Sequence, residues 1–145
     1  MDCPLKGHCL TNNVLYEATI NANIPNYSRK VYKGVTCPIF KLRFKNHEKA
    51  FNHIKYKNDC ELSKEVWKIK EGGGTYSINW RIIKQYRDYN PASKKCALCL
   101  NEKYEILIYD GDNQLNKRSE IISTCRHRRK YLLAYATSNR KEDIV

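Results

Sequence analysis

The chain has 145 residues and a formal net charge of +12, from 27 lysines and arginines against 15 aspartates and glutamates. This length allows one domain with its own core and little room for a second, and no segment approaches the ~20 apolar residues of a membrane-spanning helix. A positive charge of this size indicates a polyanionic partner such as nucleic acid, although an ordinary basic protein has the same composition.

The first half of the sequence predicts a hairpin followed by two helices. Residues 14–20 alternate between apolar and polar side chains, which is typical of a β-strand, and residues 30–35 follow a Pro-Asn turn as the return strand. An apolar stripe with helical spacing predicts a helix at about 39–54, beginning after Pro38. A second amphipathic helix contains residues 62–69 and ends at a run of three glycines.

The second half predicts one more strand and two more helices. Residues 76–83 alternate again, residues 94–108 form a third helix that breaks at Gly111, and a basic helix follows at about 117–135. The predicted order β-β-α-α-β-α-α gives an α+β fold, in which helices flank a small three-stranded antiparallel sheet.

Arg43 and His47 are four residues apart, so they project from one face of the first predicted helix. Tyr16 and Tyr32 lie on the two strands of the hairpin and are expected to face each other. Phosphodiester hydrolysis needs a base or hydroxyl for the water, a cation for the phosphate, and a carboxylate for a divalent metal. Glu102, in an otherwise apolar run, is the candidate carboxylate.

Each of these residues also has a structural explanation. A chain with 11 tyrosines uses most of them for packing. Arg43 and His47 are also typical of a solvated, lysine-rich helix, and Glu102 of an ion pair with Lys95 or Lys103. The order of the residues along the predicted elements is what favours a joint role.

Several segments of the chain resemble known motifs. Five of them contain Tyr16, Tyr32 with Gly34, Arg43 with His47, Glu102, and Asn116, and in this order they resemble the successive motifs of the GIY-YIG nucleases. More narrowly, the segments at residues 3–9, 61–67, 96–103, 115–118 and 123–127 are similar to the endonuclease domain of Penelope-like retroelements. The resemblance implies a Cys/His extension at 1–12, a nuclease core at 13–118, and a basic C-terminal helix and tail at 119–145.

The first two motifs depart from the family pattern. Val14 stands where the family name has glycine, and Lys33 stands where it has isoleucine. A regular strand does not need the backbone freedom of glycine, and a lysine fits the second position if its side chain points outward or towards DNA. Tyr16, Tyr32 and Gly34 are retained.

The resemblance implies a role for each site residue. Tyr16 would orient or deprotonate the attacking water, with Tyr32 and His47 shaping the proton network, and Arg43 would bind the scissile phosphate. Glu102 would be the lone protein ligand of Mg²⁺ or Mn²⁺. Asn116 would hold the neighbouring segment or a phosphate. The product would be a nick with a free 3′-hydroxyl.

The chain has seven cysteines, so a fully paired disulfide framework is excluded, and a reducing compartment argues against bridges. Cys96 and Cys99 have the spacing of a structural zinc site, and Cys3 and Cys9 are the expected remaining ligands. Rival ligands are His8, Cys125 and His127. Burial as small apolar side chains is the alternative for the Cys96–Cys99 pair, and Cys37 and Cys60 are interpreted as packing or incidental thiols.

The expected partner is double-stranded DNA. The side chains expected to contact it are Lys33, Lys117, Arg118, Arg126, Arg128 and Arg129. The segment before residue 13 shows no signal peptide, which favours an intracellular protein. The start at a cysteine cluster favours a piece of a longer polypeptide. The resemblance implies that this polypeptide is nuclear and also carries a reverse transcriptase. The alternatives are a zinc-stabilised nucleic-acid-binding module that does not cleave, and a domesticated repair nuclease.

Overall fold

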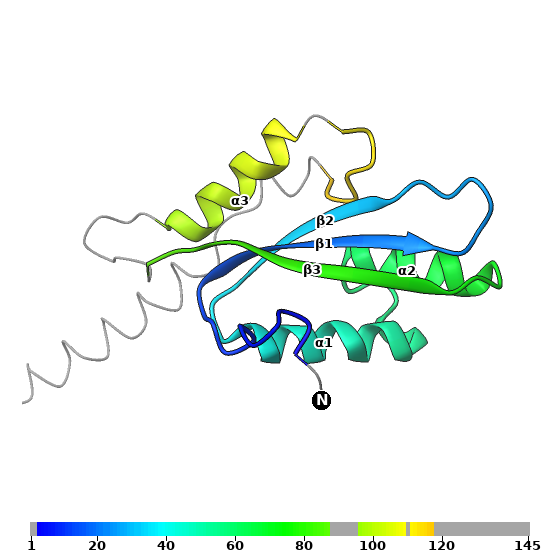
Figure 1. The fold of residues 1–145 in the computed structure, drawn as a ribbon, viewed down its shortest axis with the longest axis horizontal. Helices are drawn as coiled ribbons and strands as arrows, with labels where there is room; N and C mark the ends of the chain where they lie inside the picture. Colours follow the sequence, from blue (N-terminus) through cyan, green and yellow to red (C-terminus); the bar gives the residue numbers. More distant parts are fainter. Residues whose placement is uncertain (1–2, 88–95, 110, 118–145) are drawn as a thin grey trace, which may run out of the picture.

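The structure is a computed structural model, and it describes residues 3–87, 96–109 and 111–117 (Figure 1). The elements follow the chain as β1 (Val14–Ala22), β2 (Lys30–Thr36), α1 (Phe40–Asn52), the short 3₁₀-helix η1 (Ile54–Tyr56), α2 (Glu61–Glu71), β3 (Tyr76–Gln85) and α3 (Ala97–Ile108). The α+β class is confirmed, as is the three-stranded antiparallel sheet. The last predicted helix lies, from residue 118 on, outside the described residues.

β1 is the central strand of the sheet, whose order is β2-β1-β3. Residues 14, 15, 16, 18 and 20 of this strand are fully buried, on both faces of the sheet. The pairing of β1 with β3 shifts between Leu15 and Tyr16, which leaves Ile83 as an extra residue on β3. Such a bulge re-aims the local side chains, and here it lies beside Tyr16.

Helices cover the two faces of the sheet (Figure 1). Phe40, Phe44 and Phe51 of α1 share one apolar cluster with Leu62, Val66 and Ile69 of α2 and with the residues of β1 that point to that face. α3 lies on the opposite side of the sheet in Figure 1. Among the described residues, no helix has the length and apolar character needed to cross a membrane.

The free edge of β2 is covered by the segment that follows α3. Val31 donates its N–H to the Asn113 carbonyl at 2.9 Å, and Leu115 donates to the Val31 carbonyl at 2.7 Å. The Asn116 side chain continues the ladder, because its Oδ1 accepts from the Lys33 N–H at 2.7 Å and its Nδ2 donates to the Lys33 carbonyl at 2.8 Å. Asn116 therefore fixes the backbone of β2 next to Gly34.

The N-terminal extension caps α1. Backbone N–H groups in the first turn of a helix have no partner within the helix, and Phe40 and Lys41 donate theirs to the carbonyls of Thr11 and Cys9, at 2.9 and 2.8 Å. The extension thereby holds the start of the helix that carries Arg43 and His47.

Candidate active site

The hydroxyl group of Tyr16 lies between Arg43 and His47. Its oxygen is 2.7 Å from His47 Nε2 and accepts a hydrogen bond of 3.3 Å from Arg43 Nε. Tyr16 and His47 are buried, at 0% and 2% exposure, and Arg43 is half-buried. Three of the side chains that the sequence singled out are thus in direct contact.

The strand register explains how Tyr16 reaches this position. Tyr16 pairs with Gly34 across the hairpin, and a Cβ atom on Gly34 would stand 2.5 Å from the Tyr16 hydroxyl oxygen. The missing side chain lets the phenol lie across β2 towards α1. Arg43 and His47 are one helical turn apart on α1, and His47 belongs to the buried stripe of that helix.

Tyr32 lies two residues before Gly34 on β2 and faces the same cluster. Its ring centroid is 6.1 Å from that of His47, in an edge-on arrangement. Trp80 of β3 packs against the other side, with its centroid 5.4 Å from His47 and 5.9 Å from Tyr16. Aromatic side chains therefore surround Tyr16 and His47, both of which are buried.

Burial sets the protonation states of the cluster. It raises the pKa of Tyr16 to about 12, against the lowering effect of the Arg43 charge. Burial and the same positive charge lower the pKa of His47 to about 3. Burial also lowers the pKa of Arg43, but the contacts with Tyr16 outweigh it and the net shift is upward. At neutral pH the site therefore holds a neutral phenol, a neutral imidazole and a charged guanidinium.

Glu102 lies half-buried on α3. Its carboxylate is close enough for its charge to contribute to the raised pKa of Tyr16. Carboxylate oxygen suits Mg²⁺ or Mn²⁺, and a single protein carboxylate is a common arrangement because Mg²⁺ keeps several waters. Among the described residues, no group of three or more His, Cys, Asp or Glu side chains converges to hold a metal ion. That Glu102 binds the metal as a lone protein ligand stays a prediction.

Two predicted DNA contacts can be located. Lys33 is 4% exposed, and its Nζ lies 3.3 Å from the Glu105 carboxylate and 4.8 Å from the centre of the Tyr109 ring. This burial argues against a contact of Lys33 with DNA, which stays a prediction, because the side chain points to α3 and ties that helix to the sheet. Lys117 has a side chain that is 62% exposed, 3.6 Å from Glu61. The four predicted arginines, Arg118, Arg126, Arg128 and Arg129, lie outside the described residues.

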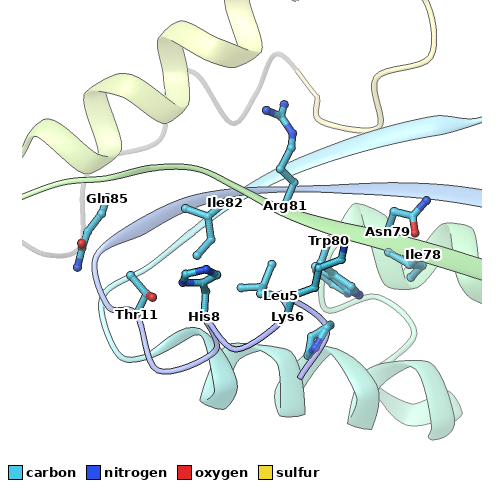
Figure 2. A pocket seen from close by; sticks show the side chains of 11 residues that line it. Leu5, Lys6, His8, Thr11, Ile78, Asn79, Trp80, Arg81, Ile82 and Gln85 are labelled. Carbon is cyan, nitrogen blue, oxygen red and sulfur yellow. The ribbon is translucent and has the colours of Figure 1, made fainter. Parts of the chain in front are cut away.

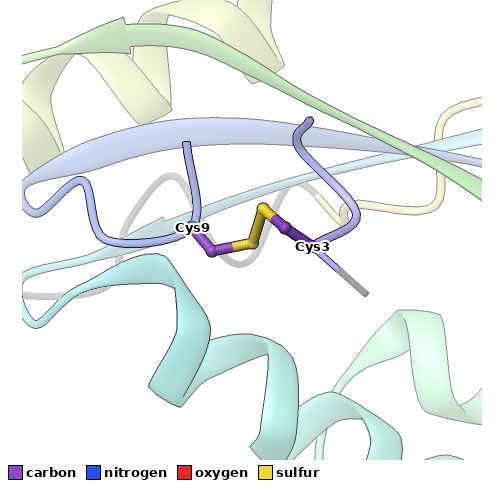
Figure 3. Close-up of a disulfide and its surroundings, with 2 residues drawn as sticks. All are labelled: Cys3 and Cys9. Atoms are coloured by element: carbon purple, nitrogen blue, oxygen red, sulfur yellow. A yellow bond between two sulfur atoms is a disulfide. The ribbon is translucent and has the colours of Figure 1, made fainter. Parts of the chain in front are cut away.

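The cysteines differ from the prediction at the N-terminus. Cys3 and Cys9 form a disulfide (Figure 3). The expectation of no bridge is therefore wrong, and neither sulfur is available to zinc in this state. The short loop between them turns through Lys6 and Gly7, which have positive φ angles, and so brings the two sulfurs together.

The other proposed zinc ligands are only partly located. Cys96 and Cys99 lie at the start of α3 and form no disulfide. Cys125 and His127 lie outside the described residues. His8 lies in the disulfide loop, where it lines a groove with β3. A zinc site on Cys96 and Cys99 stays a prediction.

Cys60 is a site residue that the sequence interpretation missed. It stands immediately before α2, as the residue that caps this helix, and its Sγ lies 3.9 Å from His47 Nδ1. Cys60 is 13 residues from His47, in an irregular segment between two helices. Its only sequence signal is the Cys60–Ser63 spacing of a helix start, which does not indicate the contact with His47.

A groove of about 870 Å³ runs between the N-terminal extension and β3 (Figure 2). Leu5, His8 and Ile82 line it, together with Trp80. Tyr16, Arg43 and His47 do not line the groove, although Trp80, which does, also packs against His47. The groove is therefore separate from the candidate site.

Comparison with known proteins gives no match: no family model, no curated protein and no solved structure is significantly similar to this chain. Any functional assignment rests on the residues of the site and on the motif resemblance.

Proposed function

We propose that the chain is a metal-dependent DNA endonuclease of the GIY-YIG type, which nicks DNA by phosphodiester hydrolysis and leaves a 3′-hydroxyl. The observation that carries this proposal is the contact of Tyr16 with both Arg43 and His47. The three residues come from two motifs on different elements, and Tyr32 and Glu102 from two further motifs lie around them.

Arg43 is the phosphate-binding residue in this proposal. Within the described part of the chain, the Arg43 side chain makes one hydrogen bond, from Nε to the Tyr16 hydroxyl. The two terminal nitrogens of the guanidinium group therefore remain for a phosphate, which they fit in a bidentate manner. Since Arg43 is half-buried and charged, its interaction with a developing negative charge is weakly screened.

Tyr16 is the residue that orients the attacking water. Its hydroxyl is neutral, because its pKa is about 12, and it is fixed by Arg43 on one side and His47 on the other. His47 is neutral too, so it offers Tyr16 a hydrogen-bonding nitrogen without adding a second positive charge beside Arg43. The Tyr32 ring packs edge-on against the imidazole of His47.

Glu102 would hold Mg²⁺ or Mn²⁺ on the α3 side of the site. When bound, such an ion stabilises the negative charge of the leaving 3′-oxygen. The contribution of the Glu102 charge to the raised pKa of Tyr16 supports this placement, because it indicates that the carboxylate and the phenol are near enough to interact.

The wider context of the proposal is a Penelope-like retroelement. The 3′-hydroxyl of the nick would prime reverse transcription by a polymerase in the same polypeptide, in the nucleus. The net charge of +12 supports binding to double-stranded DNA, with Lys117 and the arginines from residue 118 on as backbone contacts.

The experiment is a nicking assay on supercoiled plasmid with Mg²⁺ or Mn²⁺. We expect metal-dependent nicking by the wild type and none by Glu102→Ala. Glu71→Ala is the matched control, because Glu71 is an exposed carboxylate at the end of α2 that pairs with Lys57. Extension of the nick by a DNA polymerase tests for the 3′-hydroxyl. Full activity of Glu102→Ala would remove Glu102 from the site.

One observation favours a second candidate, a nucleic-acid-binding module that does not cleave. Tyr16 is completely buried, so water reaches its hydroxyl only after the surrounding side chains move. A folded wild-type protein that retards DNA in a gel but does not nick it, with either metal, would support this candidate.

A further inference from the structure

The hydrogen bonds around Tyr16 define which nitrogen of His47 carries the proton. Arg43 Nε can only donate, so the phenol oxygen accepts that bond. Tyr16 is fully buried, and His47 Nε2 is the other partner of its hydroxyl, at 2.7 Å. The hydroxyl proton is satisfied only if Nε2 accepts it. Neutral His47 then carries its own proton on Nδ1.

The Nδ1 proton faces the sulfur of Cys60. The distance from His47 Nδ1 to Cys60 Sγ is 3.9 Å, within the reach of a weak hydrogen bond to sulfur. Phe51 stacks against the imidazole and Trp80 lies beside it, and neither offers an acceptor. The Cys60 sulfur is thus the acceptor for the proton on His47 Nδ1.

The Cys60 thiol is itself held in place. It donates to Ser63 Oγ at 3.7 Å, and the single hydroxyl proton of Ser63 is shared between the carbonyls of Lys57 and Cys60, at 2.9 and 2.8 Å from Oγ. The donors therefore run in one direction, from Arg43 through Tyr16, His47 and Cys60 to backbone carbonyls. Each donor in this series has an acceptor.

We propose that Cys60 is a positioning residue, whose sulfur holds His47 in the Nδ1–H tautomer and so keeps Nε2 as the acceptor of the Tyr16 proton. The catalytic consequence rests on the proposed nuclease function, while the tautomer does not. A thiol suits this role because it is uncharged, whereas a carboxylate in its place would favour the imidazolium form, in which Nε2 becomes a donor and Tyr16 loses its acceptor.

The first test reads the tautomer directly. Two-bond ¹H–¹⁵N NMR spectra of protein with ¹⁵N-labelled histidine distinguish the two nitrogens, and the chain has four histidines, so His47→Gln identifies the signal of His47. We expect the Nδ1–H form in the wild type and in Cys60→Ser, and a large fraction of the Nε2–H form in Cys60→Val. A wild-type spectrum in the Nε2–H form would overturn the proposal, as would an unchanged tautomer in Cys60→Val.

Ser63→Ala distinguishes loss of the α2 cap from a change in the His47 tautomer. This variant removes the other member of the Cys60–Ser63 capping pair, but leaves the sulfur opposite Nδ1. We expect lower stability and an unchanged tautomer, and a tautomer change as large as that of Cys60→Val would contradict the proposal. If Cys60→Val does not fold, a wild-type spectrum in the Nε2–H form would still overturn the proposal.

The second test measures nicking. We expect the rate at saturating DNA to fall at least about tenfold in Cys60→Val, with an unchanged KM, and to recover in Cys60→Ser. Wild-type nicking by a Cys60→Val protein with an altered tautomer would overturn the positioning role. Absence of nicking in the wild type would overturn the proposed function instead and leave the tautomer result standing.

Discussion

The Tyr16 hydroxyl occupies the space that a side chain on Gly34 would need. A Cβ atom at Gly34 would lie 2.5 Å from the hydroxyl oxygen and 2.6 Å from the ring carbon that bears it, and real Cβ atoms do not approach so closely. We predict that Gly34→Ala displaces the phenol from Arg43 and His47. A displacement of about 1 Å is expected to lower the nicking rate about 100-fold, and the overpacking to cost about 1–3 kcal/mol of stability.

Gly72→Ala is the control for this substitution. A Cβ atom there would meet the Lys68 carbonyl at 3.4 Å, an ordinary contact, at the end of α2. We expect nicking by this variant at the wild-type rate. Equal activity of Gly34→Ala and Gly72→Ala would mean that the position of the Tyr16 hydroxyl does not matter for cleavage.

The Asn116 side chain holds the backbone of β2. Its carboxamide bonds both the N–H and the carbonyl of Lys33 in a buried position. We predict that Asn116→Ala lowers the free energy of unfolding by about 2–4 kcal/mol, because two buried backbone groups lose their partner. Urea denaturation measures the change. Asn79→Ala, at an exposed position of β3, is expected to change stability by less than about 0.5 kcal/mol, and an equally small effect of Asn116→Ala would contradict the role.

The sequence predicts which site residues share a face when they lie on one helix or on one hairpin, because residue spacing alone sets that face. Arg43 and His47 share a helix face through their spacing, and Tyr16 and Tyr32 share a sheet face through the hairpin, so local geometry brings each pair together. The contact between the pairs depends on the close approach of Tyr16 to Gly34, which the motif resemblance indicates and the periodicity does not.

Two features depend on tertiary contacts that leave no local pattern. Cys60 meets His47 only because the segment after α1 turns back before α2 begins. Lys33 was expected to point outward or towards DNA, yet its side chain lies against α3, which supplies Glu105. The Cys3–Cys9 bridge was missed because the predicted compartment was used to argue against it.

Lys33 and Lys117 are expected to affect DNA binding differently. Removal of a lysine that contacts a phosphate reduces the slope of log K against log salt by about one. We predict this reduction for Lys117→Ala and an unchanged slope for Lys33→Met, which keeps the long apolar stem of the buried side chain. Lys33→Met is expected to destabilise the fold instead, because Glu105 loses its partner. DNA titrations at several salt concentrations measure both slopes, and a reduced slope for Lys33→Met would restore it as a DNA contact.

The lowered pKa of His47 makes stability depend on pH in a defined direction. The pKa is about 3 in the folded protein, against an ordinary value of 6.5, so between these values the unfolded chain binds a proton that the folded protein does not. Stability is therefore lost as the pH falls below 6.5. We predict that the contribution of His47 to the free energy of unfolding decreases by about 2 kcal/mol between pH 7.5 and pH 5.

Urea denaturation of the wild type and His47→Gln across this range isolates the effect, because other titrating groups are common to both proteins. We expect the difference in free energy between them to shift steadily against the wild type as the pH falls. Parallel curves for His47→Gln would show that His47 gains its proton in the folded protein as readily as in the unfolded chain, and the neutral imidazole beside Tyr16 would have to be abandoned.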